Sequence, residues 1–215
     1  MGLAKMLFCP QNPSKLPPAR HVFAPNRRDL RIFASPKTSQ MERTLIFIRH
    51  YSLPCGEVVL GAAGGELCLC DWAGKACAER NMRRLVRLMG AEFKEESSPV
   101  LELTKAELDE YFAGRRKAFD IPLHPVGTPF QLRVWSVLTE IPYGQTRTYS
   151  EIARRVGNPR GVRAVAQAIG ANGIAILIPC HRVIGSDRSL TGFAGGLDAK
   201  RILLQTESRK AGPRP

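Results

Sequence analysis

The sequence places one reactive thiol, that of Cys180, directly before the imidazole of His181. A free cysteine has a pKa of about 8.5, so only a few per cent is nucleophilic thiolate near neutral pH. An imidazole that accepts the thiol proton corrects this, which makes Cys180 a candidate nucleophile and His181 its candidate base. Adjacent side chains usually point apart in a strand, so the proton would pass through a bridging water. The alternative is a buried cysteine beside an unrelated histidine.

A nucleophile and its base need a third group that orients the base. The last helix is expected over residues 197–207, with Asp198 in the first turn, where the helix dipole favours a carboxylate. Glu207 falls at the opposite end, where a carboxylate costs a few tenths to about 1 kcal/mol. A residue that breaks a local rule suggests a tertiary partner, and we expect that partner to be His181. A solvated, frayed helix end is the alternative.

The elements that must position these groups form a mostly helical second part. The five apolar residues 174–178 predict a buried strand or core segment that leads to the nucleophile. Capping boxes at Thr128 and Thr148 each predict the start of a helix. A further helix is indicated by apolar residues spaced i, i+3, i+4 and i+7 from Val162. The two helices separated by residues 157–159 fit a helix-turn-helix.

The charge around this helix pair favours a nucleic-acid partner. Five arginines face a single acid, Glu151, within 17 residues; they are Arg147, Arg154, Arg155, Arg160 and Arg163. One face of the second helix carries Arg163, Gln167 and Gly170, with few large side chains. Such a helix can approach a groove closely while Arg163 projects into it. An arginine on a solvated face is the alternative.

The first part of the chain has the pattern of a small antiparallel sheet with helices. Strands are expected at residues 45–48, 57–61 and 66–72, the last two joined by a glycine-rich turn. A helix is expected over residues 78–89 from its apolar spacing. A second helix should open at the capping box of Thr104 and end at Gly114, and residues 115–127 then form a linker.

The cysteines predict core packing rather than disulfides or a metal site. Six cysteines are present, at positions 9, 55, 68, 70, 77 and 180, and no secretory signal precedes them. Strand alternation would place the thiols of Cys68 and Cys70 on one face of the sheet. No histidine lies near them in sequence, so we expect no bound metal, with a metal site as the alternative.

Composition limits the classes of protein. The chain has 215 residues, a formal net charge of +13 and 44% hydrophobic residues, which excludes a wholly disordered chain. No apolar run approaches the roughly 20 residues that span a bilayer. Residues 42–121 carry a net charge of −1, whereas residues 122–207 carry +5, which indicates a polyanionic partner of the second part. The remaining excess lies at the two ends.

The N-terminal segment 1–41 carries +6 and the tail 208–215 carries +3. Three interpretations of the N-terminal segment remain open: a disordered basic extension, a transit-like peptide, or a start-site artefact in which translation begins at Met41. A cytoplasmic location is expected because the apolar start of the chain is too short for a secretory signal.

Several motifs of the second part match one known family. The longest is residues 178–185, which contain the run Pro-Cys-His-Arg-Val, and shorter matches lie at residues 127–131, 134–135, 141–146, 163–165, 172 and 192–197. On these motifs, residues 122–207 resemble the O6-alkylguanine-DNA alkyltransferases almost without gaps. Residues 42–114 resemble the variable N-terminal domain of that family more loosely.

The resemblance implies an α+β fold in two domains. Residues 42–114 would form a ribonuclease-H-like domain, a small antiparallel sheet with helices. Residues 128–207 would form a winged-helix-like helical domain with a DNA-binding helix-turn-helix, which also carries the alkyl acceptor.

The resemblance also implies an activity, DNA repair by a single-turnover transferase. The alkyl group of O6-alkylguanine, with O4-alkylthymine as a further substrate class, would move irreversibly to Cys180 without any cofactor. His181 would relay the thiol proton through water and Glu207 would hold the imidazole. Tyr149 would donate a hydrogen bond or proton to the leaving guanine, and Asn172 would brace the turn around the site.

Binding roles follow from the same resemblance. The substrate-binding residues would be Val183, Phe193, Ala194 and Lys200, and the DNA-binding residues Arg163, Thr148, Gln167, Arg160 and Arg147. Arg163 would enter the base stack and hold the space of a flipped nucleotide. The partner would be double-stranded DNA, bound by a monomer through the minor groove, and no membrane partner is implied.

The chain departs from the family at a few positions. Gly173 stands where the family usually has proline, and Gly170 lacks the larger side chain that some members carry. Phe193 and Ala194 stand where some members have Tyr and Ser. The Cys/His set of members with structural zinc is not evident.

Three competing functions are also compatible with parts of the sequence. The nearest is an alkyltransferase-like protein that senses DNA damage without repairing it. The others are a DNA-binding regulator and a cysteine hydrolase that uses Cys180, His181 and Glu207.

Overall fold

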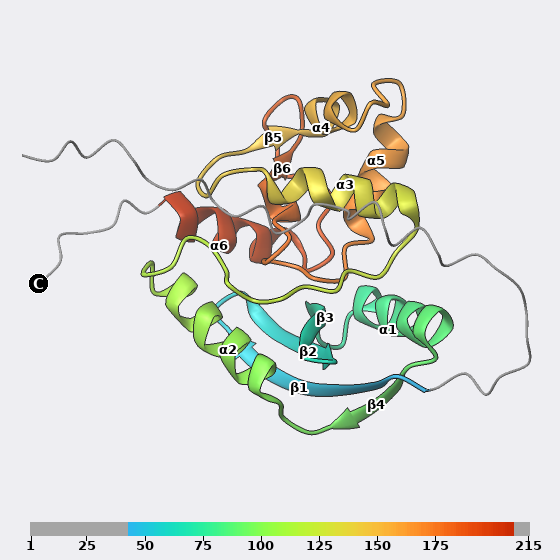
Figure 1. The fold of residues 1–215 in the computed structure, drawn as a ribbon. Coiled ribbons are helices and arrows are strands. Elements are labelled where there is room, and N and C mark those ends of the chain that lie inside the picture. Colours follow the sequence, from blue (N-terminus) through green and yellow to red (C-terminus); the bar gives the residue numbers. More distant parts are fainter. Residues whose placement is uncertain (1–42, 209–215) are drawn as a thin grey trace, which may run out of the picture. The chain divides into compact units, whose positions relative to one another are not determined.

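The computed structural model describes residues 43–208, so residues 1–42 and 209–215, with the N-terminal segment 1–41 and nearly all of the basic tail, lie outside the described residues (Figure 1). In chain order the elements are β1 (Leu45–Leu53), β2 (Gly56–Ala63), β3 (Glu66–Trp72), α1 (Ala76–Met89), β4 (Glu92–Glu95), α2 (Pro99–Phe112), α3 (Pro129–Thr139), β5 (Arg147–Thr148), α4 (Tyr149–Arg155), α5 (Val162–Gly170), the 3-10 turn η1 (Cys180–Arg182), β6 (Val183–Ile184) and α6 (Leu197–Ser208). No helix within 43–208 is long and apolar enough to cross a bilayer.

The N-terminal sheet has four strands in the order β3-β2-β1-β4. The three expected strands are antiparallel neighbours, as expected, and a fourth strand that the sequence did not indicate, β4, pairs with β1 in parallel. A parallel pair needs a crossover connection, and α1 lies in the connection that returns the chain to β1. Strand β4 is short and charged, so it lacks the apolar run from which a strand can be predicted.

A β-bulge separates the two central cysteines of β3. The register between β2 and β3 shifts between Gly61 and Ala62, so Cys68 is the extra residue of β3. Cys68 therefore packs in the cluster with α1, whereas Cys70 belongs to the main core. The expectation that both thiols share one face was wrong, because a bulge interrupts the alternation of the strand.

Helix α2 begins earlier than its capping box suggested. Ser98 is the N-cap and Pro99 occupies the first turn, where its missing N–H costs nothing. Thr104 lies inside the helix, and its hydroxyl donates to the carbonyl of Val100, four residues back, at 2.6 Å. The expected start at Thr104 was wrong, since this hydroxyl bonds within a helix that has already formed.

The helices of the second part begin as expected. Thr128 and Thr148 form complete capping boxes at the starts of α3 and α4. Residues 174–178 are buried but do not form a strand; they make turns, and Ile176 has a φ of 70°. Positive φ is rare for a β-branched residue and marks a strained backbone. This segment is therefore a core segment with a bent backbone.

The active-site segment and the segment before α3 both lie along the edge of β3. The amide of Cys70 donates to the carbonyl of Gly173 at 2.8 Å, and the amide of Ala175 donates to the carbonyl of Cys70 at 2.7 Å. At the start of β3, the amide of Leu67 donates to the carbonyl of Pro122 at 2.8 Å. The outer edge of β3 is thus paired with segments from beyond the sheet.

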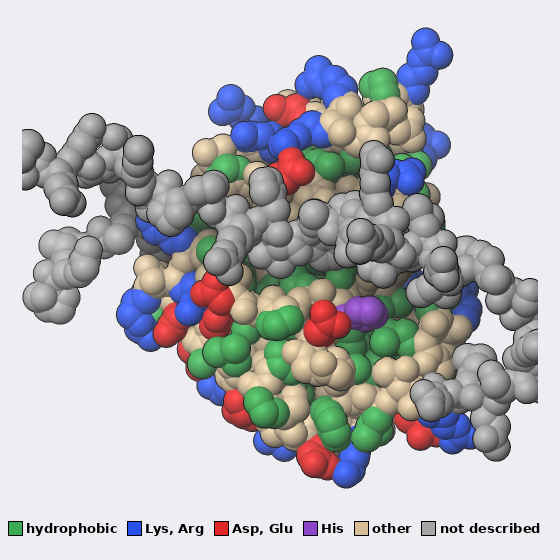
Figure 2. All heavy atoms as spheres, viewed as in Figure 1, with side chains coloured by type: hydrophobic (Ala, Val, Ile, Leu, Met, Phe, Trp, Pro, Cys, Tyr) green, Lys and Arg blue, Asp and Glu red, His purple; other side chains and the backbone are tan. Residues whose placement is uncertain are grey.

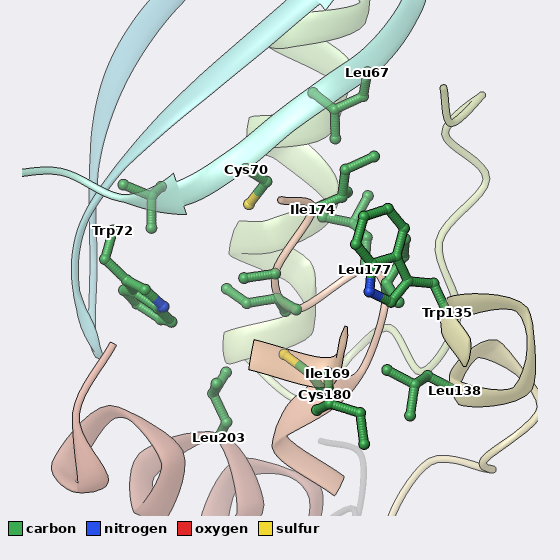
Figure 3. Packing of buried hydrophobic residues seen from close by; sticks show 14 of the residues in the cluster. Leu67, Cys70, Trp72, Trp135, Leu138, Ile169, Ile174, Leu177, Cys180 and Leu203 are labelled. Carbon is green, nitrogen blue, oxygen red and sulfur yellow. The ribbon is translucent and has the colours of Figure 1, made fainter. Parts of the chain in front are cut away.

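One hydrophobic core runs through both parts of the chain (Figure 3). Leu67, Cys70 and Trp72 from β3 pack in the same cluster as Trp135 from α3 and Leu203 from α6. The fold is therefore α+β as expected, with a sheet that supports a helical part carrying the helix-turn-helix of α4 and α5.

Candidate active site

The candidate nucleophile, Cys180, lies at the start of a tight turn inside the core. It opens η1 directly after Pro179 and is only 8% exposed. A small pocket reaches its side chain and is lined by the end of β3, the end of α5 and the loop 192–194. The thiol thus has a small opening toward these three segments.

Asn172 holds the backbone around this thiol. Its side-chain oxygen accepts from the amide of Ile174 at 3.0 Å, and its amide nitrogen donates to the carbonyl of Ile178 at 2.9 Å. The same nitrogen lies 3.3 Å from Sγ of Cys180. Burial raises the pKa of Cys180 to about 11, although the hydrogen bond from Asn172 lowers it. The resting nucleophile is therefore a neutral thiol that needs a base.

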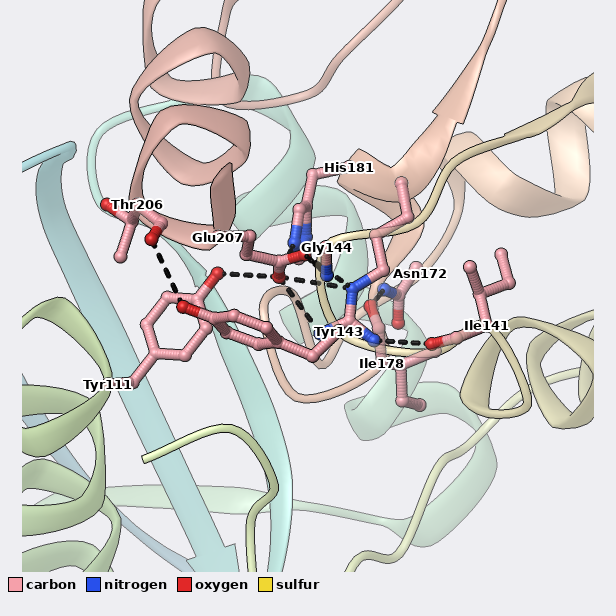
Figure 4. Close-up of polar contacts among 10 residues, drawn as sticks. Tyr111, Ile141, Tyr143, Gly144, Asn172, Ile178, His181, Thr206 and Glu207 are labelled. Carbon is pink, nitrogen blue, oxygen red and sulfur yellow. Dashed lines mark hydrogen bonds and ion pairs between the residues drawn. The ribbon is translucent and has the colours of Figure 1, made fainter. Parts of the chain in front are cut away.

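The imidazole of His181 is oriented by Glu207, as the sequence predicted (Figure 4). Nε2 of His181 lies 2.8 Å from Oε1 of Glu207, and both side chains are almost fully buried. Burial lowers the pKa of His181, although Glu207 opposes that shift. A neutral imidazole facing a carboxylate places its proton on Nε2, because the carboxylate can only accept. Nδ1 is then left with a lone pair for a proton.

Glu207 collects more donors than the sequence suggested. Arg182 donates to both carboxylate oxygens, and the Tyr111 hydroxyl donates to Oε1 at 2.8 Å. The amide of Gly144 donates to Oε2 at 2.9 Å. Burial raises the pKa of Glu207, but the hydrogen bonds from His181 and Arg182 outweigh it and hold the pKa at about 2. The carboxylate is therefore a permanent anion, which favours a proton on His181.

Arg182 and Tyr111 were missed because their roles depend on long-range packing. Arg182 also donates to the carbonyl of Ile141 at 2.5 Å, which ties α6 and η1 to the turn after α3. The one local signal was a third polar residue in the run of residues 180–182, at the end of an apolar segment. Tyr111 belongs to α2, 96 residues before Glu207, and only the fold brings the two side chains together.

No direct hydrogen bond joins the thiol of Cys180 to the imidazole of His181 in the described part of the chain. Within residues 43–208, Nδ1 of His181 has no hydrogen-bond partner, although it is buried. A buried acceptor without a protein partner is normally satisfied by water. This geometry is compatible with the expected proton path through water, because Nδ1 is the ring nitrogen that Glu207 leaves unoccupied.

Part of the pocket lining comes from the N-terminal sheet and the loop before α6. Phe193 and Ala194 line the pocket, as the resemblance implied, and Trp72 at the end of β3 faces Phe193 edge-on with ring centroids 5.7 Å apart. Trp72 also packs so closely on Gly195 that a Cβ there would lie 2.3 Å from the indole. Trp72 was not identified as a site residue from the sequence, where it was only the last residue of an expected strand.

Val183 and Lys200, which the resemblance implied as substrate-binding residues, are not among the residues that line this pocket. Lys200 is fully buried, and its ammonium donates to the carbonyls of Val183 at 2.6 Å and Thr191 at 2.9 Å. Burial lowers the pKa of Lys200.

Tyr149 is half-buried and donates to the carbonyl of Thr191 at 3.3 Å. Burial raises the pKa of Tyr149, so its hydroxyl stays protonated near neutral pH. Its single O–H can donate to another group only by leaving these long contacts with the loop carbonyls.

The expected DNA-binding residues lie on the exposed side of α4 and α5, where Figure 2 shows lysine and arginine side chains gathered. Arg163 and Gln167 of α5 and Arg160 before it are exposed. Thr148 is committed to its capping box, since its hydroxyl bonds the amide and the carboxylate of Glu151. Arg147 is half-exposed, and its guanidinium donates to the carbonyl of Thr146 and to the side chain of Gln145.

Helix α1 braces the turn that carries Asn172, a feature the sequence did not reveal. Asn81 donates from one amide nitrogen to the buried carboxylate of Asp71 at 2.6 Å and to the carbonyl of Asn172 at 3.2 Å. The end of α5 therefore rests on side chains from the first part of the chain. Within residues 43–208, no group of three or more His, Cys, Asp or Glu side chains is placed to hold a metal ion.

Comparison with protein families matches both parts of the chain. Residues 46–125 match the ribonuclease-like domain of 6-O-methylguanine DNA methyltransferase, and residues 129–209 match its DNA binding domain. The methylated-DNA–protein-cysteine methyltransferase of Haemophilus influenzae is 40% identical over 165 residues, which cover 76% of this chain and 87% of that protein. The inducible enzyme of that name from Bacillus subtilis is 51% identical over 114 residues, 53% of this chain and 64% of that protein.

Solved structures give the same result. The crystal structure of Mycobacterium tuberculosis OGT in complex with DNA is 37% identical, covers 75% of this chain and 92% of that chain, and superposes with a TM-score of 0.65. The R37K variant of the same protein superposes with a TM-score of 0.67 over 79% of this chain.

Proposed function

The chain belongs to the O6-methylguanine DNA methyltransferase family, and we propose that Cys180 is the residue on which it accepts the alkyl group. It is a DNA repair protein that transfers an alkyl group from O6 of guanine in DNA to one of its own cysteines. The observation that carries the assignment of Cys180 is its place beside His181, whose ring is held by Glu207. The described residues contain other buried cysteines, but none precedes a histidine.

The transfer is a displacement at the alkyl carbon. The sulfur of Cys180 forms the new S–C bond while the C–O6 bond breaks, and the electron pair of that bond stays with the guanine. The thiol proton passes through water to Nδ1 of His181, and the anion of Glu207 stabilises the resulting imidazolium. The departing guanine gains one proton, which leaves a neutral base and a thioether. A thioether is not hydrolysed under mild conditions, so each molecule acts once.

Tyr149 is the proposed donor to the departing guanine. A guanine anion in an apolar pocket would be costly, since burial without a partner penalises charge. The phenol of Tyr149 stays protonated and stands beside Thr191 and Gly192, next to the pocket loop. It therefore donates a hydrogen bond or proton to the base as the alkyl group leaves.

The substrate base must leave the duplex to reach this pocket. Unpairing and unstacking a nucleotide costs a few kcal/mol. The exposed side of α5 has small residues around Arg163, so the helix approaches the minor groove closely while the guanidinium enters the base stack. All groups in this scheme come from a single chain, which supports action as a monomer.

The proposed acceptor is tested with DNA that carries O6-methylguanine labelled on the methyl group. One label per protein molecule, recovered on the peptide that contains Cys180, is expected. Many turnovers would instead indicate a hydrolase. Tight binding without label would indicate a damage-sensing protein, and either result would contradict the assignment.

Arg163→Ala should slow transfer from alkylguanine in duplex DNA by about tenfold or more, because the vacated space in the stack is no longer filled. Transfer from an unpaired alkylguanine in a single strand should slow much less. Single-turnover rates on the two DNAs measure the difference. The exposed Arg201→Ala on α6 serves as the control for loss of charge. Equal slowing on both DNAs would count against the role of Arg163 in base extrusion.

The rate of transfer should be flat from pH 7 to 9 and fall below about pH 6.5. The thiol proton moves to a neutral His181, so the rate is lost only as falling pH protonates that ring in advance. Burial lowers the pKa of His181, which puts the loss below the ordinary value of that group. Single-turnover rates across this range are the measurement. A tenfold rise per pH unit from 7 to 9 would mean that the thiol ionises without a base.

A further inference from the structure

The polar stripe on the exposed side of α5 stops one turn before the helix ends. Arg163 and Gln167 are exposed and lie four residues apart, and the next position on that face is Gly170, which has no side chain. Gly170 also lines the pocket that reaches Cys180. A DNA strand whose nucleotide enters the pocket would therefore pass Gly170. The carbonyl ends of a helix repel phosphate, so this end needs a cation.

Helix α1 supplies that cation from the other part of the chain. Nη2 of Arg80 lies 3.1 Å from the carbonyl oxygen of Gly170, and Nη1 of Arg84 lies 2.9 Å from that of Ala171. Arg80 is exposed and makes no ion pair with a carboxylate within residues 43–208. A guanidinium has five N–H donors in a flat fork, and this contact uses one of them. The others remain available to an oxyanion.

The surroundings of Arg80 are also positive. It borders an open groove of about 620 Å³ between α1 and the start of α3, and the groove is lined by Arg80, Arg83, Arg84 and Arg87. Arg83 forms an ion pair with Glu79 at 3.5 Å. Glu79 is the only acidic residue on α1. An arginine row that begins beside the pocket and continues along a groove fits a chain of phosphates spaced along a strand.

We propose that Arg80 binds a phosphate of the DNA strand beside the flipped nucleotide, so that the ribonuclease-like part contributes directly to DNA binding. The guanidinium lies beside the backbone carbonyl of Gly170, and it extends the stripe of Arg163 and Gln167 by one turn. Guanidinium groups match phosphate oxygens bidentately, which suits this role. The inference rests on the proposed function, since it takes DNA in the pocket of Cys180 as given.

The alternative is that Arg80 only caps the end of α5, and Arg80→Gln separates the two. A glutamine amide can still donate to a carbonyl oxygen, but it carries no charge for a phosphate. Binding of Arg80→Gln to an undamaged duplex should weaken about three- to tenfold, and the slope of log K against log salt should fall by about one. Lys105→Gln, on the exposed side of α2 and paired with Asp109, is the matched control and should leave the slope unchanged.

Gly170→Arg provides the second test. A Cβ at position 170 meets no atom within 4 Å and the glycine is helical, so a side chain can begin there without a clash. In the Arg80→Gln background it should restore both the affinity and the salt slope. An unchanged slope in Arg80→Gln, or a double variant that stays as weak as the single one, would overturn the proposal. Melting temperatures of all variants identify any loss of folding.

The experiment also separates this inference from the proposed function. Transfer from free O6-methylguanine base, which has no phosphate, reports on Cys180 alone. In Arg80→Gln the rate on an alkylated duplex at low DNA concentration should fall relative to the rate on the free base. If the unaltered protein fails to react with either substrate, the proposed acceptor is wrong; if both rates fall equally in Arg80→Gln, the phosphate contact is wrong.

Discussion

Cys180→Ala is expected to abolish alkyl transfer completely while binding to undamaged duplex DNA stays unchanged. The sulfur forms the new bond, so no other side chain can replace it in the displacement. The side chain is only 8% exposed and carries no charge as a thiol, so its loss removes no contact with phosphates. Mass spectrometry of the intact protein after incubation with O6-methylguanine DNA measures the transfer, and a binding titration measures the affinity.

Cys77→Ala is the matched control for a buried thiol. Burial raises the pKa of Cys77 to about 11, as it does for Cys180, and its sulfur lies 3.8 Å from the carbonyl oxygen of Ala194 beside the same pocket loop. Cys77 has no imidazole beside it in sequence, so this variant should transfer normally. A methyl group recovered on Cys77, or full transfer by Cys180→Ala, would show that proximity to the pocket rather than His181 selects the acceptor.

Glu207→Gln should both destabilise the fold and slow the reaction. All the groups that contact the carboxylate are donors, and the amide nitrogen of glutamine would face at least one of them. Removing one partner of a buried pair leaves Arg182 without its countercharge, which costs about 3–5 kcal/mol. The imidazolium of His181 loses its anion as well, so transfer should slow by about 10²- to 10⁴-fold. Denaturant unfolding and single-turnover kinetics measure the two effects.

Asp198→Asn in the first turn of the same helix is the control. Its carboxylate is 90% exposed and pairs with Arg201 at the surface, so the loss should be below about 1 kcal/mol. A Glu207→Gln protein as stable as Asp198→Asn would contradict the central position of Glu207. Normal transfer by Glu207→Gln would instead remove it from the proton path and leave it a purely structural group.

Local chemistry accounts for the elements that the sequence predicted well. The helices α3 and α4 begin at capping boxes whose partners are three residues apart, so all the information lies within one turn. The pairing of Glu207 with His181 was predicted from a single misplaced charge at a helix end. The same logic failed at Thr104, where the pattern of a capping box occurs inside a helix and only the proline at position 99 marks the true start.

The features that escaped prediction depend on contacts between distant segments. Trp72 reaches the site from the sheet and Tyr111 reaches it from α2. No local pattern in the sequence between these residues and Cys180 indicates that they come together. The bulge at Cys68 is set by the register of β2 against β3, which alternation within one strand cannot reveal. Strand β4 pairs with β1 through only four residues, three of them charged.

The pairing along the outer edge of β3 bears on the solubility of the protein. An uncovered edge strand offers free amides and carbonyls to other chains and so invites aggregation. Here the backbone of residues 173–175, on the way to Cys180, covers the end of that edge. Any event that lifts this segment from β3 would expose an apolar strand end at the same moment as it displaces the nucleophile. If the two backbone hydrogen bonds of Cys70 break, the protein loses its reactive site and also becomes prone to self-association.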